Sequence, residues 1–586
     1  MRLCAWHEEE LISMDTTTNA AATARDQLAA WQASKPRDFF SADRNLQRVL
    51  RRYLGARYAA FEPRLRAFGG ACATTIDEAA RVEDRIGNHP RLERWTGIGE
   101  RVEEIEFHPH HERIGRLVWD AGLMALQAEP GNMVAQMGLV YLLAQNGEGG
   151  HMCSLACTSG LVRALQQLGD APLKQRFLPP LLRADYETMQ HGAQFLTEVQ
   201  GGSDVGANAV IAVDAGDGTW RISGEKWFCS NINADQFLMT ARPQGAGEGT
   251  RGLGLFLVPR RLEDGSLNGF HIRRLKDKLG TRTLASAEVD FRDAVAYPLG
   301  ALDRGFRNVV ELVLNTSRLF NAVGCAGGMR RALVEASAYA CHRQAFGETI
   351  VRYPLVQEAL ADLVTETQAA VASSFHIAHL LDQIETGVAD EDAHARYRLL
   401  VNVNKYLTSI RMTEMVHRAI EVFGGNGAIE SFSVLPRLYR DAVVYESWEG
   451  THNVLALQVL RDISRYGVFA PFAAWLTREL NAVVHLREQA IAALGALERT
   501  EALLTRLTQG DARFAEAHAR RAIDQIGVLA QGALLILEGE WEREQGIASE
   551  KEAVIEHFLN RHLRPGYDAA EDAGYLAQVE RLAAAM

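Results

Sequence analysis

The sequence predicts a mainly helical α+β protein in which helices come first, a β domain follows, and a helical bundle and a further helical domain complete the chain. Apolar residues recur at helical spacing in MVAQMGLVYLLAQ and SGLVRALQQLG. Between residues 194 and 299 the pattern changes to short alternating runs bounded by Gly, Pro or Asp, such as TWRISGEKWFCS and SAEVDFRDAVAY, which indicate strands. Helical periodicity returns with NVVELVL and persists to the C-terminus.

These changes of pattern divide the chain into stretches that we interpret as domains. We expect a disordered or helical tail over residues 1–40, a helical domain over 41–190, a β domain over 191–300, a helical bundle over 301–464 and an extra helical domain over 465–586.

Composition limits the possible functions. The formal net charge of −12 provides no overall basic field, so tight binding to phosphate polyanions is not expected. Seven cysteines without a CxxC pair suggest a reduced compartment. No apolar run approaches a membrane span, and the N-terminus lacks the apolar core of a signal peptide, whether Met1 or Met14 is the start. We therefore expect a soluble cytoplasmic protein.

The stretch YRDAVVYESWEGTHN holds three carboxylates among apolar and aromatic residues: Asp441, Glu446 and Glu449. Glu449 follows a tryptophan and precedes Gly450 and Thr451, and Thr451 is a candidate N-cap for the apolar run from residue 454 to residue 460. We interpret Asp441, next to Arg440, as structural and Glu446 as solvated or capping. Taken alone, Glu449 fits either a surface acid beside a helix or a catalytic base.

Several short motifs follow one another in an order that resembles that of the acyl-CoA dehydrogenase family. They are TEVQGGSDV, GEKWF, RQAFG, VFGGNG and the RD followed by WEGT, and the resemblance covers residues 40–463. The wording of QGGSDV, KDKLGTR and SWEG is most similar to the AidB branch, whose flavin-containing members are associated with the adaptive response to alkylation. The resemblance implies a middle β-barrel-like domain and a C-terminal four-helix bundle.

The resemblance also implies FAD as cofactor, bound between the β domain and the bundle. Leu196, Thr197, Gly202 and Ser203 match residues that contact the isoalloxazine and the pyrophosphate, and Phe228, Cys229 and Ser230 match a second flavin-binding segment. Phe228 stands where the family has a stacking Trp, although a phenyl face can still stack. Thr451 and Asn453 complete this part of the expected cofactor site.

Other motifs match segments that, in the family, reach the FAD of a neighbouring subunit. These residues are Arg343, Phe346, Glu421, Gly424 and Gly425. A guanidinium fork matches phosphate oxygens, so Arg343 is expected on the pyrophosphate. Glu421 departs from the family's usual Gln. The resemblance therefore implies a homotetramer built from dimers.

Glu449 matches the family's catalytic base. Dehydrogenation needs a carboxylate in an apolar pocket, where its pKa rises toward the working pH, to remove the α-proton of an acyl-CoA thioester. Some relatives carry the base just before an arginine, but Ser317 precedes Arg318 here and cannot serve. Ser203, Arg318, Trp448 and Gly450 are expected to contact the substrate, a branched or medium acyl-CoA, with electron-transfer flavoprotein or another acceptor as partner.

Two other functions are compatible with the same motifs. In the AidB branch the extra C-terminal domain is associated with DNA binding, but residues 465–586 contain 13 Lys and Arg against 18 Asp and Glu. That balance opposes phosphate unless folding gathers Arg520, Arg521, Arg561 and Arg564 on one side. An oxidase that passes electrons to O₂ is the other alternative.

No metal site is expected. The histidines of FHPHHER, residues 107–113, lack the rest of a ligand set, and Pro109 suggests a turn. Cys153 and Cys157 lie four residues apart on an expected helix, where they fit small core residues better than ligands.

Overall fold

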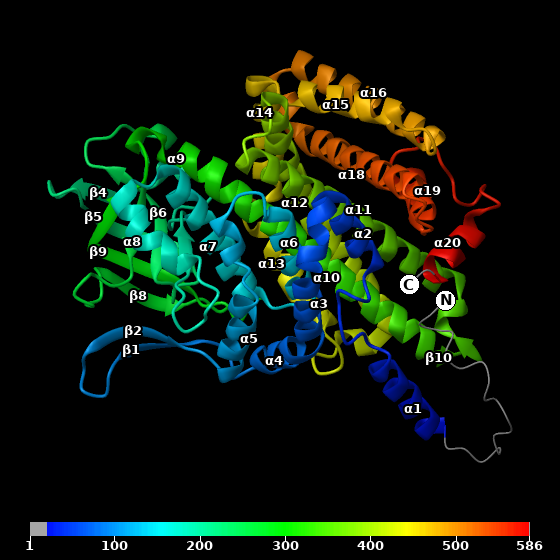
Figure 1. Cartoon of the computed structure of the whole chain (residues 1–586), viewed down its shortest axis with the longest axis horizontal. Coiled ribbons are helices and arrows are strands. Elements are labelled where there is room, and N and C mark those ends of the chain that lie inside the picture. Colours follow the sequence, from blue (N-terminus) through cyan, green and yellow to red (C-terminus); the bar gives the residue numbers. More distant parts are fainter. Residues whose placement is uncertain (1–19, 585–586) are drawn as a thin grey trace.

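The computed structural model describes residues 20–584, and in it a closed β-sheet stands at one end of a set of long helices (Figure 1). The choice between Met1 and Met14 as start, and the first half of the expected tail, lie outside the described residues. Helix α1 (Ala20–Ala33) occupies most of the rest of that tail. The predicted fold class, mainly helical with a β domain in the middle, is confirmed.

The first part of the chain is helical apart from one hairpin. Its elements are α2 (Arg44–Leu54), α3 (Tyr58–Ala71), α4 (Asp77–Glu83), strands β1 (Arg91–Trp95) and β2 (Arg101–Glu106), α5 (Pro109–Asp120), α6 (Met133–Ala144), α7 (Gly149–Leu168) and α8 (Ala171–Leu181). Pro109 does not make the predicted turn. It is the first residue of α5, where its missing N–H leaves no helical hydrogen bond unmade, and His108 is the N-cap.

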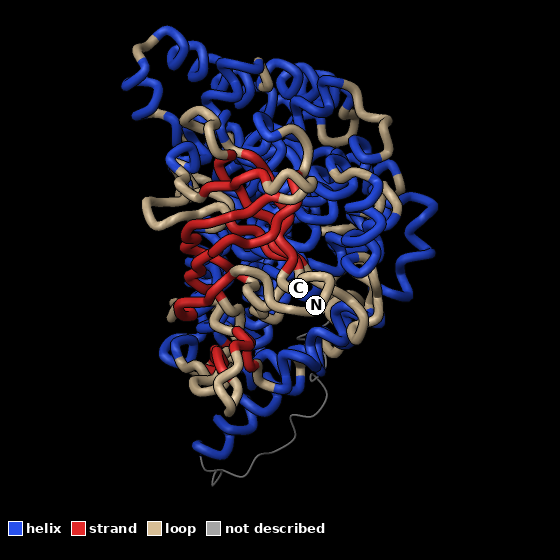
Figure 2. Tube along the Cα trace, turned by 90° about the vertical axis from the view of Figure 1, so that its left-hand side faces the viewer, coloured by secondary structure: helices blue, strands red, loops and turns tan. Residues whose placement is uncertain are grey.

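The middle of the chain forms a sheet that closes on itself. Its strands are β3 (Gly192–Phe195), β4 (Ile211–Asp214), β5 (Trp220–Ser230), β6 (Gln236–Pro243), β7 (Gly254–Pro259), β8 (Phe270–Leu275) and β9 (Ser286–Pro298). The order is β3-β6-β4-β5-β9-β7, and the additional pairing of β7 with β6 closes the ring, as the β-barrel-like prediction requires. Figure 2 shows these strands gathered in one body among helices. Phe195, Phe237 and Phe270 fill its interior.

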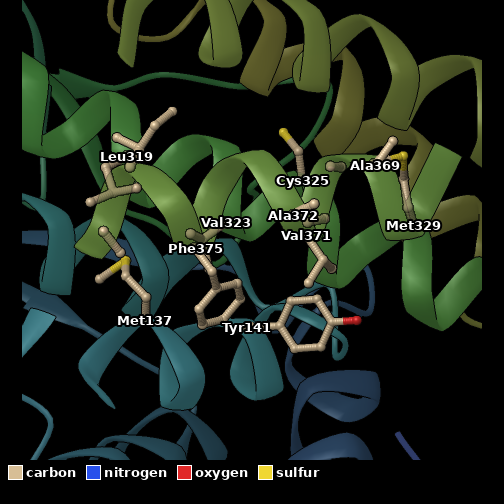
Figure 3. Close-up of a cluster of buried hydrophobic side chains, with 14 of the residues drawn as sticks. Met137, Tyr141, Leu319, Val323, Cys325, Met329, Ala369, Val371, Ala372 and Phe375 are labelled. Carbon is tan, nitrogen blue, oxygen red and sulfur yellow. The ribbon is translucent and has the colours of Figure 1, made fainter. Parts of the chain in front are cut away.

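Long helices follow the sheet and form the main core. They are α9 (Gly305–Asn308), α10 (Asn315–His342), α11 (Pro354–Glu385), α12 (Glu391–Phe423), α13 (Leu435–Ser447) and α14 (His452–Tyr466), with the short strands β10 (Gln344–Ala345) and β11 (Glu348–Thr349) between α10 and α11. Side chains from α6, α10 and α11 interlock in this core, among them Tyr141, Val323 and Phe375 (Figure 3).

The chain ends in a helical extension that packs on the bundle (Figure 1). It consists of α15 (Phe469–Ala482), α16 (Arg487–Gln509), α17 (Ala512–Ala517), α18 (Ala519–Glu544), α19 (Lys551–His562) and α20 (Tyr575–Ala584). Contrary to the sequence expectation, α18 is long and apolar enough to cross a membrane by length and composition alone, but 83% of its apolar window is buried inside the protein. Its composition is that of a core helix.

Candidate active site

The predicted base lies in a four-residue connection between α13 and α14. Trp448 ends α13 in an extended conformation, and Glu449 and Gly450 then take positive φ angles of 55° and 110°. A positive φ is strained for a glutamate but open to glycine. Thr451 holds the N-cap position of α14 as predicted, but its side chain makes no capping hydrogen bond. The connection is therefore fixed by contacts from other helices.

Two buried cations stabilise this connection by hydrogen bonds to its backbone. Arg318, on α10, donates from Nε to the carbonyl oxygen of Glu449 at 3.0 Å. Lys405, on α12, donates from Nζ to the carbonyl oxygens of Glu446 at 2.8 Å and Gly450 at 3.1 Å. Both cations thus bind backbone, and no partner for the Glu449 carboxylate is found among residues 20–584.

The remaining N–H groups of Arg318 are also engaged inside the protein. They donate to the side chains of Asn315, Asn402 and Gln458, and Arg318 is only 2% exposed. That Arg318 contacts the acyl-CoA stays a prediction. The guanidinium is fully used in positioning, because a buried arginine must satisfy its donors within the protein.

The carboxylate of Glu449 lies in surroundings that favour its neutral form. Burial raises the pKa of Glu449 to about 7, and the nearby charges of Arg318 and Lys405 oppose the shift. Burial also lowers the pKa of Lys405 to about 8. A carboxyl group with a pKa near 7 is suited to exchange a proton with a substrate at neutral pH.

The other two carboxylates of the motif are engaged in hydrogen bonds. One carboxylate oxygen of Glu446 lies 2.8 Å from Nε2 of His452, and the other accepts from the Thr413 hydroxyl. Glu446 is therefore neither freely solvated nor a helix cap, and although burial opposes it, these bonds lower its pKa. Asp441 is buried and accepts the backbone N–H of Thr281 at 2.6 Å, a contact that joins α13 to the loop before β9.

An apolar wall stands beside the Glu449 connection. Trp448 packs on Tyr445 with ring centroids 4.8 Å apart and against a small cluster of Cys153, Cys157 and Leu284. The two cysteine sulfurs, 3.8 Å apart, belong to free thiols. The expectation that these cysteines are small core residues is confirmed, and they form an apolar wall beside the half-buried Glu449.

The predicted flavin-binding residues of the β domain gather around the C-terminal end of β5. Phe228 is 50% exposed, with Nζ of Lys276 4.7 Å from its ring centroid. The Ser230 hydroxyl lies 2.9 Å from that of Ser286. Cys229 is completely buried in the sheet interior, so only its backbone remains available to a ligand.

The TEVQGGSDV segment forms a tight turn next to β5. A Cβ atom at Gly202 would lie 2.6 Å from the Thr197 hydroxyl, so the turn requires glycine at that position. The carbonyl of Leu196 accepts from Lys226, whose Nζ also pairs with Glu198 at 2.8 Å. Ser203 is exposed at the tip of the turn. This buried ion pair fixes the turn while leaving its outer face open.

The residues expected to serve a neighbouring subunit lie elsewhere. Beyond α10, Arg343 and Phe346 border the β10–β11 hairpin, which stands at the end of the bundle away from the sheet (Figure 1). Phe346 is 98% exposed, and no atom lies within 4 Å of a Cβ built at Gly424 or Gly425. Glu421 is exposed at the end of α12. Within one chain these residues therefore cannot join the group around Phe228.

Comparison with known proteins gives consistent matches along the chain. The AidB N-terminal domain matches residues 31–188, and the acyl-CoA dehydrogenase middle and C-terminal domains match residues 193–294 and 303–464. Acyl-CoA dehydrogenase family member 11 of Caenorhabditis elegans is 32% identical over 520 residues, which are 85% of this chain and 83% of that protein. AidB of Escherichia coli is 34% identical over 64% of this chain and 70% of its own.

The chain belongs to the acyl-CoA dehydrogenase family. The crystal structure of C. elegans ACDH-11 in complex with C11-CoA agrees, with a TM-score of 0.83 and 30% identity over 89% of this chain and 90% of that chain. The resemblance to the family and to its AidB branch is thus confirmed.

Sequence reasoning missed the residues that support the Glu449 loop of this family member. Lys405, Asn402 and Gln458 carry no motif, but Lys405 interrupts an apolar helical run with no acidic residue three or four positions away. A lysine placed in that way must be buried against acceptors or face a ligand. This isolated lysine in an apolar helix was the sequence signal that could have identified Lys405.

The basic residues of the extension do not form a common surface. Arg561 pairs with Asp362 and Glu366 of the bundle, and Arg564 pairs with Glu556. Arg520 donates to Asn453, a predicted cofactor residue, at 2.9 Å. Arg521 lines an open groove of about 500 Å³ together with Arg506, Phe514, His518 and Asp524.

Proposed function

We propose that this protein is an FAD-dependent acyl-CoA dehydrogenase in which Glu449 removes the α-proton of an acyl-CoA thioester. The observation that carries the proposal is the position of Glu449, a half-buried carboxyl group whose pKa is raised to about 7 by burial, on a strained loop that Arg318 and Lys405 anchor. Family membership supplies the reaction class, and this geometry supports the assignment of the base.

The residues of this chain fit a flavin. Phe228 offers a half-exposed π-face, Ser230 and Thr197 offer hydroxyl groups, and the open turn at Gly202 and Ser203 exposes backbone N–H groups suited to phosphate or to the polar edge of the ring. The chemistry supplied by bound FAD is two-electron oxidation, in which a hydride leaves the substrate β-carbon.

The protein orients the base, shields the base from water and supplies the proton acceptor itself. Arg318 and Lys405 fix the backbone around Glu449, so the carboxylate is already oriented toward the substrate α-carbon before the substrate binds. Trp448 and the Cys153–Cys157 wall exclude water and keep the carboxylate basic enough to accept the proton. The backbone N–H of Glu449 is the predicted donor to the thioester carbonyl, which polarises the α-C–H bond.

We assign acyl-CoA esters of branched or medium acyl chains as substrates. The C11-CoA bound by C. elegans ACDH-11 supports acyl-CoA as ligand class for a chain of this architecture. Electron-transfer flavoprotein or another acceptor reoxidises the protein in this scheme. A homotetramer follows from the second group of residues, around Arg343 and Gly424, which reach a flavin only in a neighbouring subunit.

An AidB-like role on DNA is the second candidate, because the N-terminal part matches the AidB N-terminal domain. The extension argues against it, since Arg561 and Arg564 are neutralised by acidic partners. A gel shift on duplex DNA between 50 and 200 mM salt separates the two, because phosphate binding weakens steeply over that range.

Anaerobic titration with a panel of acyl-CoAs, followed by the absorbance of the oxidised flavin, tests the main proposal. We expect acyl-CoAs of one chain class to bleach the flavin in the wild type and in Glu446→Gln, which changes a second acid of the same motif on α13, but not in Glu449→Gln with FAD bound. Bleaching that persists in Glu449→Gln would assign the base elsewhere. Bound FAD that no acyl-CoA bleaches would remove the dehydrogenase proposal.

A further inference from the structure

A second group of buried ionisable side chains lies where α4, α5 and α7 meet. It consists of Glu83, His111, Glu148 and His151, none of which the dehydrogenation uses. One ligand atom from each of His111, Glu148 and His151 lies within 4.8 Å of the other two. Nδ1 of His151 is 3.2 Å from Oε1 of Glu148, and Nδ1 of His111 is 3.6 Å from Oε2 of Glu83.

Several polar atoms of this group lack hydrogen-bond partners although they are buried. Within residues 20–584, no hydrogen bond is made by either carboxylate oxygen of Glu83 or by Nδ1 of His111 or His151. Glu83 is 1% and His151 is 3% exposed. The Thr283 hydroxyl is near enough to lower the pKa of Glu83 but makes no hydrogen bond of good geometry with it. Buried polar atoms without partners are rare and call for a ligand or a compensating contact.

The two carboxylates of the group differ in their partners. Glu148 is the N-cap of α7 and accepts the backbone N–H groups of Gly150 at 3.0 Å and His151 at 2.9 Å. Glu83 has no comparable donors, and among residues 20–584 no Lys or Arg forms an ion pair with either carboxylate. A buried carboxylate without a hydrogen-bond partner or a cation is costly, so the group lacks a positive charge beside Glu83.

The surroundings fix the two imidazole rings. Phe107 stacks on His111 with centroids 4.0 Å apart, and Trp119 meets His151 edge-on at 6.1 Å. A Cβ at Gly150 would lie 2.7 Å from Oε1 of Glu148 and 3.3 Å from Cε1 of His111. Only glycine therefore fits at this position beside the group. Locked rings around unpaired donor atoms are typical of a preformed ligand set.

We propose that Glu83, His111, Glu148 and His151 bind one divalent transition-metal ion, with zinc as the ion best matched to two imidazoles and two carboxylates. Ligand atoms of a tetrahedral zinc site lie about 3.3–3.6 Å apart, since Zn–N and Zn–O bonds are about 2.0–2.2 Å. The distances of 3.2 and 3.6 Å fit that spacing. His111, Glu148 and His151 form the set whose ligand atoms lie within 4.8 Å of one another, and Glu83 is placed next to that set by its contact with His111. Imidazole ligands disfavour magnesium and calcium.

This site would serve structure rather than dehydrogenation, because all four positions are supplied by the protein. The ion would join the N-terminus of α7 to α4 and α5, and α7 carries Cys153 and Cys157, which form the wall behind Trp448. The His111 side chain is 13% exposed and provides the path of entry. The two carboxylate charges would be offset by the ion's charge of +2.

Zinc binding by the full-length protein tests this inference. After dialysis against a chelator, zinc chloride is titrated in competition with a chromophoric chelator, and bound metal is counted by mass spectrometry. We expect one zinc per chain, at least tenfold weaker binding in Glu83→Gln, and loss of binding in His111→Gln. The control is His191→Gln, whose ring touches the same Trp119 but instead bonds to Asn231, and it should bind like the wild type.

Thermal unfolding provides the second readout. Zinc should raise the melting temperature of the wild type and of His191→Gln, because a ligand that binds only the folded state stabilises it. The shift should be absent in His111→Gln, and if that variant does not fold, the near-isosteric Glu83→Gln decides. Wild-type protein that binds no zinc, or binding and thermal shift that are unchanged in folded Glu83→Gln, would overturn the proposal.

Discussion

Nε of Arg318 donates to the carbonyl oxygen of Glu449 across 3.0 Å, from a helix 131 residues earlier in the chain. The bond holds a glutamate whose φ of 55° is rarely populated, a strain of about 1–3 kcal/mol that surrounding contacts must offset. Because the guanidinium is buried and fully hydrogen-bonded, the interaction is a positioning device. It relates the core of the bundle directly to the orientation of the proposed base.

Arg318→Lys should therefore damage both catalysis and stability. An ammonium cannot reproduce the fork that reaches Glu449, Asn402 and Gln458 together, so buried acceptors lose their donors. We expect kcat to fall about 100-fold with a smaller change in KM, and the free energy of unfolding to fall by about 2–4 kcal/mol. Steady-state kinetics and urea unfolding measure both. Arg461→Lys, an exposed arginine of α14, is the control, and an unchanged kcat would contradict the positioning role.

The pH dependence of flavin reduction should report Glu449. Burial raises its pKa from 4.5 to about 7, and only the deprotonated carboxylate accepts a proton. The rate of reduction by acyl-CoA should therefore rise with pH and level off above an apparent pKa near 7. Stopped-flow absorbance between pH 5.5 and 9 provides the profile. A profile that is flat over this range would mean that another group limits proton removal.

The same shift predicts a change in stability with the opposite slope. A raised pKa in the folded state means that the folded protein holds a proton that the unfolded chain has released. The contribution of Glu449 to stability is thus present below pH 4.5 and lost as pH rises through 7. Glu449→Gln has no such titration. Its free energy of unfolding relative to that of the wild type should therefore rise by roughly 2 kcal/mol between pH 5 and pH 8. Denaturant unfolding of both proteins at the two pH values measures the gain, and a constant difference would show that the carboxyl group is well hydrated.

Much of the fold was accessible from the sequence because its signals are local. Alternation in TWRISGEKWFCS predicted β5, and helical spacing predicted α6 and α7, since each pattern reflects the burial of one segment. The domain limits at residues 190, 300 and 464 stay predictions. Pro109 was misjudged because a proline signals a turn and a helix start equally well.

The candidate site was less accessible because its key contacts are distant in sequence. Arg318 was expected at the substrate, but its burial against Gln458 depends on the packing of α10 with α14, which no local pattern records. Lys405 was missed for the same reason. Cys229 was placed at the cofactor by its motif, yet the register of β5 with β9 turns its side chain into the sheet. Motifs fix which segments matter, and tertiary packing decides which atoms they present.

Gly450→Ala should weaken the catalytic loop through its backbone alone. The φ of 110° at Gly450 is unfavourable for any residue with a Cβ. The nearest atom to an added Cβ is 3.5 Å away, so the methyl group would fit and the cost would come from the backbone conformation. We expect a loss of about 1–3 kcal/mol in unfolding free energy and a loss of activity at least as large as fivefold. Calorimetry and turnover assays measure these. In the control Gly495→Ala, within α16, stability should stay equal or rise slightly. Equal effects in the two variants would contradict the argument.

Phe228→Ala should weaken FAD binding while leaving the fold intact. The ring is half exposed at the end of β5, so its removal costs little packing, but a flavin stacked there would lose roughly 1–1.5 kcal/mol. We expect the Kd for FAD to rise about tenfold, and Phe228→Trp to lower it. Fluorescence quenching of added FAD measures the affinity. Phe514→Ala, a comparably exposed ring in the extension, is the control, and a Kd unchanged in Phe228→Ala would move the flavin away from β5.

Arg343→Ala and Glu449→Gln should restore each other when both chains occupy one oligomer. The β10 strand next to Arg343 and the β5 strand lie at opposite ends of the folded molecule, so an arginine that binds FAD must serve the site of another subunit (Figure 1). Each variant alone should be inactive or nearly so. A hybrid should recover one kind of site, which combines Glu449 of the Arg343→Ala subunit with Arg343 of the Glu449→Gln subunit. Co-expression with two affinity tags isolates the hybrids, and their acyl-CoA-dependent flavin reduction is compared with that of mixtures of separately purified variants. If Arg343 acted within its own chain, no subunit of the hybrid would hold a complete site and activity would stay absent.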